Sequence, residues 1–269
     1  MGVTAYFDGS RTDRFLTLAC IACTDDAWVE LSTAWLQMRD DLQGNASHES
    51  LHMTDLVAKQ GAFKGWENPK VNWVANFYFN VLGAYNNDPR VKAWTCTIDL
   101  TAHALRKEEK SLPEPERICT RILLGAVMKW FMDWDNRLPS PLHLVFDRGE
   151  QFMRHVREDW ENTDYKRRYS WMQAIASIEL AVSSVTPALQ MVDMIAWGTI
   201  RRAKHPWGHE GIRDPLALQA ERVLPPNAYR IYDEELRTQR FDEEGYRAMN
   251  PQRREQQERS FLRKAIIRP

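Results

Sequence analysis

Short apolar runs alternate with longer segments whose apolar residues recur every three or four positions. Runs rich in β-branched and aromatic residues predict strands, and the three-to-four spacing predicts helices. The expected strands are residues 3–7, 15–23, 91–100, 142–146 and 175–182; the expected helices are one from Thr24 to about Gly44, then residues 71–84, 116–134, 150–160 and 187–202. A hairpin, with its turn at residues 8–10, followed by alternating strands and helices predicts an α/β fold with a mixed sheet flanked by helices.

The C-terminal part of the chain has a different composition. From residue 233 onward the charge density rises and the apolar periodicity fades, and six basic residues stand against two glutamates in residues 250–269. We therefore expect a main domain over residues 1–230 and a charged, basic, helical extension over residues 231–269. That extension either packs as a solvated helix or contacts phosphates.

Composition narrows the class of protein. The chain of 269 residues is 43% hydrophobic and mixes charges of both signs, as in a folded globular protein. No basic and apolar leader opens it, and its most apolar long segment contains Arg121 and Lys129, so we expect a cytoplasmic protein without a membrane span. The net charge of -1 counts against tight nucleic-acid binding, although bound cations would offset acidic residues. Nucleic acid stays a candidate partner, and the oligomeric state is not predicted.

The cysteines offer one candidate metal motif. Cys20 and Cys23 have the spacing of half a zinc site, but Cys96 and Cys119 supply no second half. Cys20 and Cys23 also fall in an expected strand, where residues three apart point to opposite faces. We therefore expect reduced thiols in the core.

Three aspartates occupy positions where the neighbouring residues predict burial. Asp8 and Asp147 directly follow core-like strand residues, and ligand sites in α/β sheets gather at strand ends. Asp193 lies in a helix that is apolar on nearly every side, where a lone ionised carboxylate would cost on the order of several kcal/mol. Gln190, three residues earlier, can donate a hydrogen bond to that carboxylate or to a bound oxygen. Any one aspartate could equally cap a turn or meet an arginine, but three together favour a divalent-cation site.

Four segments resemble the family called domain of unknown function 3800: AYFDGS at residues 5–10, LHMTD at 51–55, LVFD at 144–147 and ALQMVDMIA at 188–196. That family is considered RNase H-like. The resemblance implies that Asp8, Asp147 and Asp193 are the first, second and third acids of its site. Such a site would bind two Mg²⁺ or Mn²⁺ ions about 3.5–4 Å apart, with Asp8 bridging them, and cleave phosphodiesters by in-line displacement.

The chain departs from that family at one position. The family often has a glutamate after the first aspartate, whereas this chain has Gly9, so one ligand is missing and Glu150 or Asp55 would replace it. His52 is a candidate to orient water or move a proton, with an ordinary loop histidine as the alternative. Ser10, Arg148 and Gln190 are the candidate substrate-binding residues.

The predicted function is a metal-dependent nuclease or phosphodiesterase, with two alternatives. One is a non-catalytic RNase H-like regulatory or interaction module, which the missing acid and the near-neutral charge favour. The other is a zinc metalloprotease, because residues 48–52 fit the pattern of two histidines four positions apart around a glutamate. That pattern needs a helix and a third ligand, and no familiar continuation follows it.

Overall fold

A computed structural model describes residues 2–42, 51–85, 88–101, 103–104, 113–134, 141–164 and 170–204. His48, the domain boundary expected at residue 230 and the basic extension over residues 231–269 lie outside these ranges. No helix within them is long and apolar enough to cross a membrane.

Five strands form one mixed sheet in the order β3-β2-β1-β4-β5. The strands are β1 (Val3–Arg11), β2 (Phe15–Thr24), β3 (Val91–Asp99), β4 (Leu142–Asp147) and β5 (Ile175–Ala181). β2 pairs antiparallel with both β1 and β3, whereas β4 pairs parallel with both β1 and β5. The prediction of a mixed sheet is therefore confirmed, and each expected strand is present.

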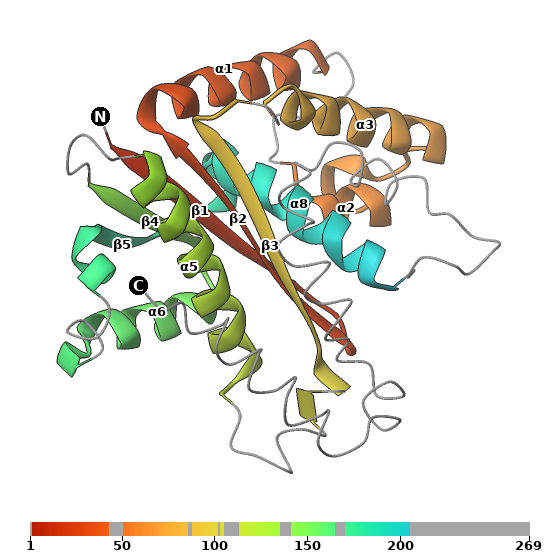
Figure 1. Cartoon of the computed structure of the whole chain (residues 1–269). Helices are drawn as coiled ribbons and strands as arrows, with labels where there is room; N and C mark the ends of the chain where they lie inside the picture. The colour runs from red at the N-terminus through yellow and green to blue at the C-terminus, as the bar shows by residue number, and fades with distance from the viewer. Residues whose placement is uncertain are drawn as a thin grey trace.

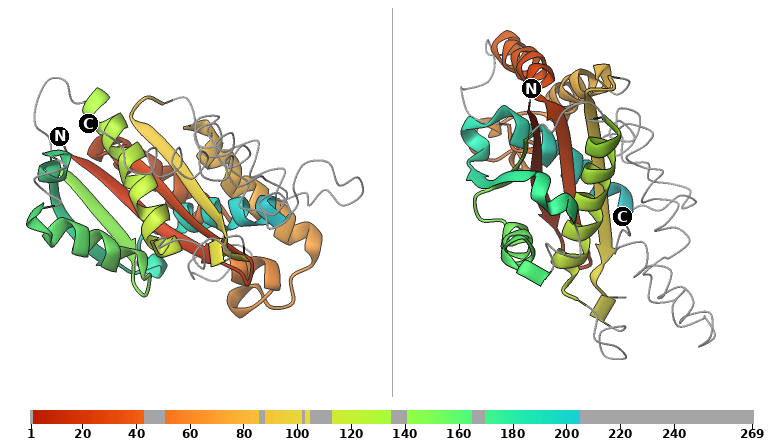
Figure 2. Two further views of the ribbon diagram at one scale, coloured as in Figure 1. Left: turned by 60° about the horizontal axis from the view of Figure 1, so that its bottom comes forward. Right: turned by 60° about the vertical axis from the view of Figure 1, so that its left-hand side comes forward.

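Helices cover both faces of this sheet. They are α1 (Asp25–Leu42), α2 (Met53–Ala58), α3 (Asn68–Ala84), α5 (Pro115–Trp134), α6 (Phe152–Glu161) and α8 (Pro187–Lys204), with short 3-10 helices η1 (Gly61–Phe63), η2 (Ser170–Ala174) and η3 (Ser183–Val185). In Figure 1, α8 crosses behind β2 and β3, and α5 lies in front of the sheet. One core joins α1, α2, α3 and α8 to the rear face, and a second joins α5 and α6 to the front face (Figure 2).

The two central cysteines lie in different cores. Cys23 packs in the core beneath α8, whereas Cys20 packs in the core beneath α5. Both thiols are free and buried, as are those of Cys96 and Cys119. The prediction that Cys20 and Cys23 point to opposite faces is confirmed, so these two thiols do not share a zinc site.

β1 continues past the point where the sequence predicts a turn. Asp8, Gly9 and Ser10 remain paired with β2, and the hairpin turn comes later, where the N–H of Thr12 donates to the carbonyl of Phe15. The prediction of a turn at residues 8–10 was wrong because the backbone hydrogen bonds to β2 continue through them, which outweighs the turn preference of Gly9 and Ser10. Asp8 therefore lies within a strand.

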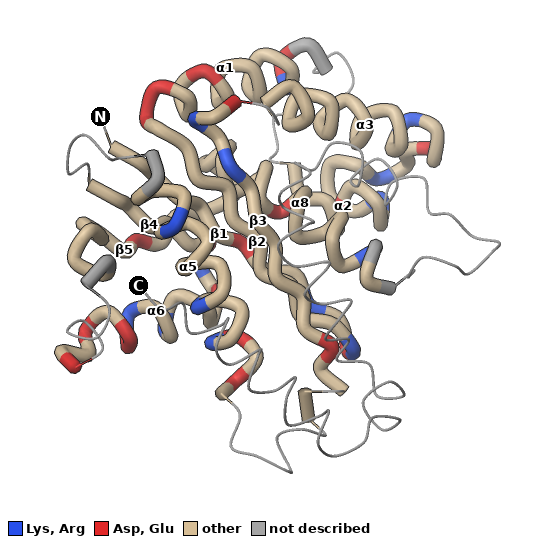
Figure 3. Tube along the Cα trace, in the orientation of Figure 1, with Lys and Arg blue, Asp and Glu red and all other residues tan. Residues whose placement is uncertain are grey.

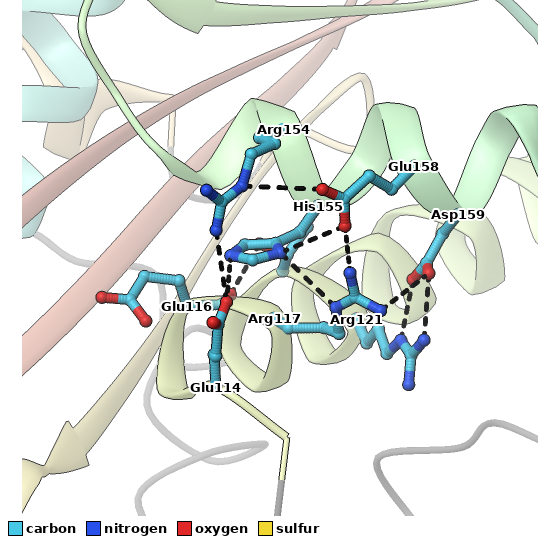
Figure 4. Close-up of polar contacts among 9 residues, drawn as sticks. Glu114, Glu116, Arg117, Arg121, Arg154, His155, Glu158 and Asp159 are labelled. Carbon is cyan, nitrogen blue, oxygen red and sulfur yellow. Dashed lines mark hydrogen bonds and ion pairs between the residues drawn. The ribbon is translucent and has the colours of Figure 1, made fainter.

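Ion pairs join α5 to α6 (Figure 4). Arg121 on α5 makes a bidentate pair with Asp159 on α6, at 2.8 and 3.0 Å. Arg117 pairs with Glu158, and the buried ring of His155 lies with Nε2 3.2 Å from a carboxylate oxygen of Glu114. We call this group the α5–α6 clamp. It fixes α6, which begins shortly after Asp147.

Candidate functional site

Asp8 and Asp147 lie next to each other on neighbouring parallel strands. The last Cα pair of β1 and β4 is Phe7 with Phe146, whose rings stack at 4.6 Å. The next residue on each strand is Asp8 or Asp147, so the register carries the two carboxylates side by side at the end of β4. Because Phe7 packs beneath α5, strand alternation turns the side chain of Asp8 to the opposite face, toward α8. There it is buried, and its Oδ1 accepts a 2.8 Å hydrogen bond from the Gly9 N–H.

Asp193 comes to the same place from α8, which packs against β1. Its side chain is buried, and its Oδ2 accepts a 2.8 Å hydrogen bond from the N–H of Met53. The Nε2 of His52 lies 4.0 Å from the other oxygen. Burial raises the pKa of Asp193, and the positive charge of a protonated His52 opposes this effect. In the described part of the chain, the buried carboxylate of Asp193 thus has two polar contacts, the N–H of Met53 and the ring of His52.

Glu150 supplies a fourth carboxylate. It was expected in the first turn of a helix, but α6 begins at Phe152 and Glu150 precedes it, because Gly149 with φ 109° turns the chain after Asp147. A Cβ atom on Gly9 would lie 2.9 Å from Oε2 of Glu150 and 2.5 Å from the Phe152 ring. Glu150 therefore occupies space that a side chain at position 9 would need. Position 9 directly follows the first aspartate, and the family that the chain resembles often has a glutamate there. Burial, with the charge of Asp147, raises the pKa of Glu150 to about 6.

The four acids form one electrostatic group, which we call the acidic site: Asp8, Asp147, Glu150 and Asp193. Burial, together with the charges of Asp193, Glu150 and Asp147, raises the pKa of Asp8 to about 9. Among the described residues, no lysine or arginine nitrogen lies within 4.0 Å of these four carboxylates. In the same part of the chain, the basic group at that distance is His52, whose Nε2 lies 4.0 Å from Asp193. An arginine paired with each aspartate was the alternative to a shared cation site. The described part of the chain contains no such pairs.

A hydrogen-bonded chain holds Asp147 in place. Its Oδ1 accepts a 3.0 Å hydrogen bond from the N–H of Ser183 in η3, and the Ser183 carbonyl accepts a 2.9 Å bond from Nε2 of Gln190. The amide oxygen of Gln190 accepts a 3.2 Å bond from the Trp35 indole. Gln190 was expected to donate to Asp193 or to a bound oxygen, but the structure directs it to Ser183 instead. It therefore positions Asp147 through η3.

Sequence reasoning missed Trp35 and Ser183 as supports of the site. Trp35 lies in the helix that the sequence predicts from Thr24 to about Gly44, and the apolar spacing that predicts this helix does not reveal where an indole N–H points. Gln190 gave the one available signal, because a buried amide requires partners for both its oxygen and its nitrogen.

His52 lies between two carboxylates at the edge of the acidic site. Its Nδ1 is 3.5 Å from Asp55 on α2, and its Nε2 faces Asp193. The side chains of His52 and Asp55 are 47% and 46% exposed, so this pair connects the buried acids with solvent. His52 itself has extended backbone angles, φ −126° and ψ 119°, immediately before α2. The zinc-protease pattern needs this histidine on a helix, so the geometry is against that alternative; His48 lies outside the described residues.

The two remaining predicted residues lie nearby. Ser10 is half-buried on β1, two positions after Asp8 and therefore on the same face. Arg148 follows Asp147 directly, with an exposed side chain and an N–H that donates to the Ala181 carbonyl. Their role in substrate binding stays a prediction.

The donor set suits hard divalent cations, which prefer carboxylate oxygens. Within the described residues, however, no three His, Cys, Asp or Glu side chains are close enough to hold one ion as they stand. The acids are near enough to raise one another's pKa, but their oxygens do not converge on a point. Side-chain rotation about the fixed backbone positions would be required for shared ligation.

Comparisons of the chain with known protein families, with curated proteins and with solved structures give no match. The resemblance to the family of domain of unknown function 3800 therefore stays a prediction from the four short segments.

Proposed function

We propose that the protein is a divalent-metal-dependent phosphodiesterase or nuclease of RNase H-like type. One observation carries the proposal: acids from β1, from the end of β4 and from α8 gather in one site, where Asp8 and Asp193 are buried and no lysine or arginine partner lies among the described residues. Buried carboxylates without compensation are unfavourable, and hard divalent cations remove this cost.

The topology supports the RNase H-like part of the proposal. The resemblance implies a first acid on strand one, a second after a central strand and a third in a late helix. Asp8 on β1, Asp147 at the end of β4 next to it and Asp193 on α8 satisfy that order. The mixed sheet with helices on both faces agrees with it as well.

The acidic site would hold Mg²⁺ or Mn²⁺ through Asp8, Asp147, Asp193 and Glu150, with Asp55 as a further candidate ligand. When bound, such a cation supplies Lewis acidity for attack on a phosphodiester. Burial and the neighbouring acids raise the pKa of Asp8 to about 9, so its carboxyl is neutral at pH 7 in the metal-free protein. Asp8 would hold the cation as a carboxylate and would release this proton to solvent. His52 accepts or returns a proton at Nε2, and Asp55 orients its ring through Nδ1.

A cleavage assay tests the proposal. The full chain is incubated with single- and double-stranded DNA and RNA in Mg²⁺, in Mn²⁺ and in EDTA, beside Asp193→Asn and the control Asp13→Asn, which changes an exposed aspartate of the β1–β2 turn. We expect cleavage with Mg²⁺ or Mn²⁺ by the wild type and by the control, and none in EDTA or by Asp193→Asn. Cleavage that persists in Asp193→Asn would refute the assigned site.

A non-catalytic RNase H-like module is the second candidate. It is favoured by the lack of three converging ligands in the described ranges and by the near-neutral net charge. Calorimetry separates the two: in the nuclease, Asp8→Asn and Asp193→Asn lose affinity for Mn²⁺, whereas in the module their affinity equals that of the wild type.

We also propose a cytoplasmic location. Its support is that all four cysteines are free thiols buried in the cores, as is usual in a reducing compartment.

A further inference from the structure

The outward face of α3 lacks the charges that other surface helices carry. Over its 17 residues α3 has a single charged side chain, Lys70, which lies over the Trp66 ring at 4.0 Å. Charges of both signs are spread along α1, α5 and α6, whereas most of α3 is free of them (Figure 3). A solvent-facing helix of a globular protein is usually charged on its outer side. The exception suggests that something other than water covers α3.

Two aromatic rings project from this face. Trp73 is 56% exposed and Phe77, one turn later, is 39% exposed. Their rings stack with centroids 5.8 Å apart and planes 26° from parallel. The other side of α3 is buried against α1 and α2 through residues such as Val74 and Phe79. Trp73 and Phe77 are therefore not part of the core, and they form the centre of an exposed apolar patch.

A row of asparagines runs beside the aromatic rings. Asn68, Asn72, Asn76 and Asn80 recur every fourth residue, so they form a stripe along the helix. Asn68 and Asn80 are exposed, and the other two are half-buried. The Oδ1 atom of Asn76 is buried and has no hydrogen-bond partner within the described chain. That atom lies within the packing of the chain itself, so the exposed Asn68 and Asn80 are the members of the row that are most open to a partner.

We propose that the α3 face binds the α3 face of a second copy of this chain. In a two-fold interface the same residues meet from both sides, so a face with several like charges would repel itself. This face avoids that repulsion. Amide side chains both donate and accept, so two identical rows of asparagine can satisfy each other. Trp73 and Phe77 supply the buried aromatic contacts that dominate interface energies.

The size of the face sets the strength of this dimer. A helix of 17 residues is about 25 Å long at about 1.5 Å per residue. Such a face is smaller than the roughly 800 Å² per partner of a standard interface. We therefore expect reversible, concentration-dependent association.

Sedimentation velocity of the full chain over a range of concentrations tests the proposal. The variants are Trp73→Glu and Trp73→Lys, alone and mixed, with Met132→Glu as the control, because Met132 is 58% exposed on α5 in the opposite layer. We expect the wild type and the control to dimerise, each Trp73 variant alone to associate about thirtyfold more weakly, and the mixture to recover association through opposite charges. Circular dichroism verifies that the variants are folded.

Three results would overturn the proposal: a wild type that stays monomeric at every concentration, folded Trp73 variants that dimerise as tightly as the wild type, or a mixture that stays monomeric. A single-stranded oligonucleotide that quenches tryptophan fluorescence in wild type but not in Trp73→Phe, with no dimer present, would assign the face to nucleic acid instead. None of these measurements depends on whether the acidic site is active.

Discussion

Replacing Asp8 by asparagine is predicted to stabilise the metal-free protein. Burial and the three neighbouring acids raise the pKa of Asp8 from 3.8 to about 9. At pH 7 the folded chain therefore keeps a proton that the unfolded chain has lost. An amide of the same shape carries no charge at any pH, so Asp8→Asn removes this difference between the two states.

The magnitude follows from proton linkage. A carboxyl whose pKa is higher in the folded state loses stability as pH rises from its unfolded value, here 3.8, toward its folded value of about 9. Between pH 3.8 and pH 7 the loss is about 4 kcal/mol, at about 1.4 kcal/mol per pH unit. We expect Asp8→Asn to exceed the wild type by up to about 4 kcal/mol at pH 7 and by little near pH 4.

Urea unfolding in EDTA at several pH values between 4 and 8 measures this difference, with Asp13→Asn as the control. Addition of Mn²⁺ then supplies the opposite test. The wild type should gain about 2.7 kcal/mol at a concentration one hundred times the dissociation constant, because the ion binds the folded state, and Asp8→Asn should gain far less. If the wild type and Asp8→Asn have the same stability from pH 5 to pH 8 in EDTA, Asp8 is not held neutral in the fold and the reasoning fails.

Three further substitutions test the supports of the acidic site. Gln190→Leu leaves the Ser183 carbonyl without its donor, so we expect urea unfolding to show a stability lower by about 1–3 kcal/mol. We also expect calorimetry to show weaker Mn²⁺ binding. An unchanged Mn²⁺ affinity would mean that η3 does not position the ligands of the acidic site. Gly9→Ala places a Cβ atom 2.5 Å from the Phe152 ring, so the melting temperature should fall by an amount equivalent to about 1–3 kcal/mol, and a rise would contradict the close contact. His52→Ala should slow cleavage by about 10²–10⁴-fold and leave Mn²⁺ affinity nearly unchanged; a loss of affinity instead would make this histidine a ligand.

The strands and the longer helices were predictable because each has a local signal. β2 and β4 are apolar runs bounded by turn residues, and α8 has an apolar surface on nearly every side. Asp193 was identifiable for the same reason, since an acid within such a helix contradicts its surroundings.

The partners of these residues were not predictable, because they depend on contacts across the chain. Trp35 is 155 residues from Gln190, whose amide it binds. Glu150 was placed inside a helix, since the sequence does not reveal that Gly149 turns the chain first. The turn expected at Gly9 failed because strand pairing with β2 decided the backbone there.

The α5–α6 clamp contains a buried titratable group, as the acidic site does. Burial and the neighbouring Arg117 lower the pKa of His155 below its usual 6.5, so this ring is neutral at pH 7 and above. In the acidic site, burial raises the pKa of Glu150 to about 6 and that of Asp8 to about 9. Burial thus favours the uncharged form in both places, as an imidazole in the clamp and as protonated carboxyls in the acidic site.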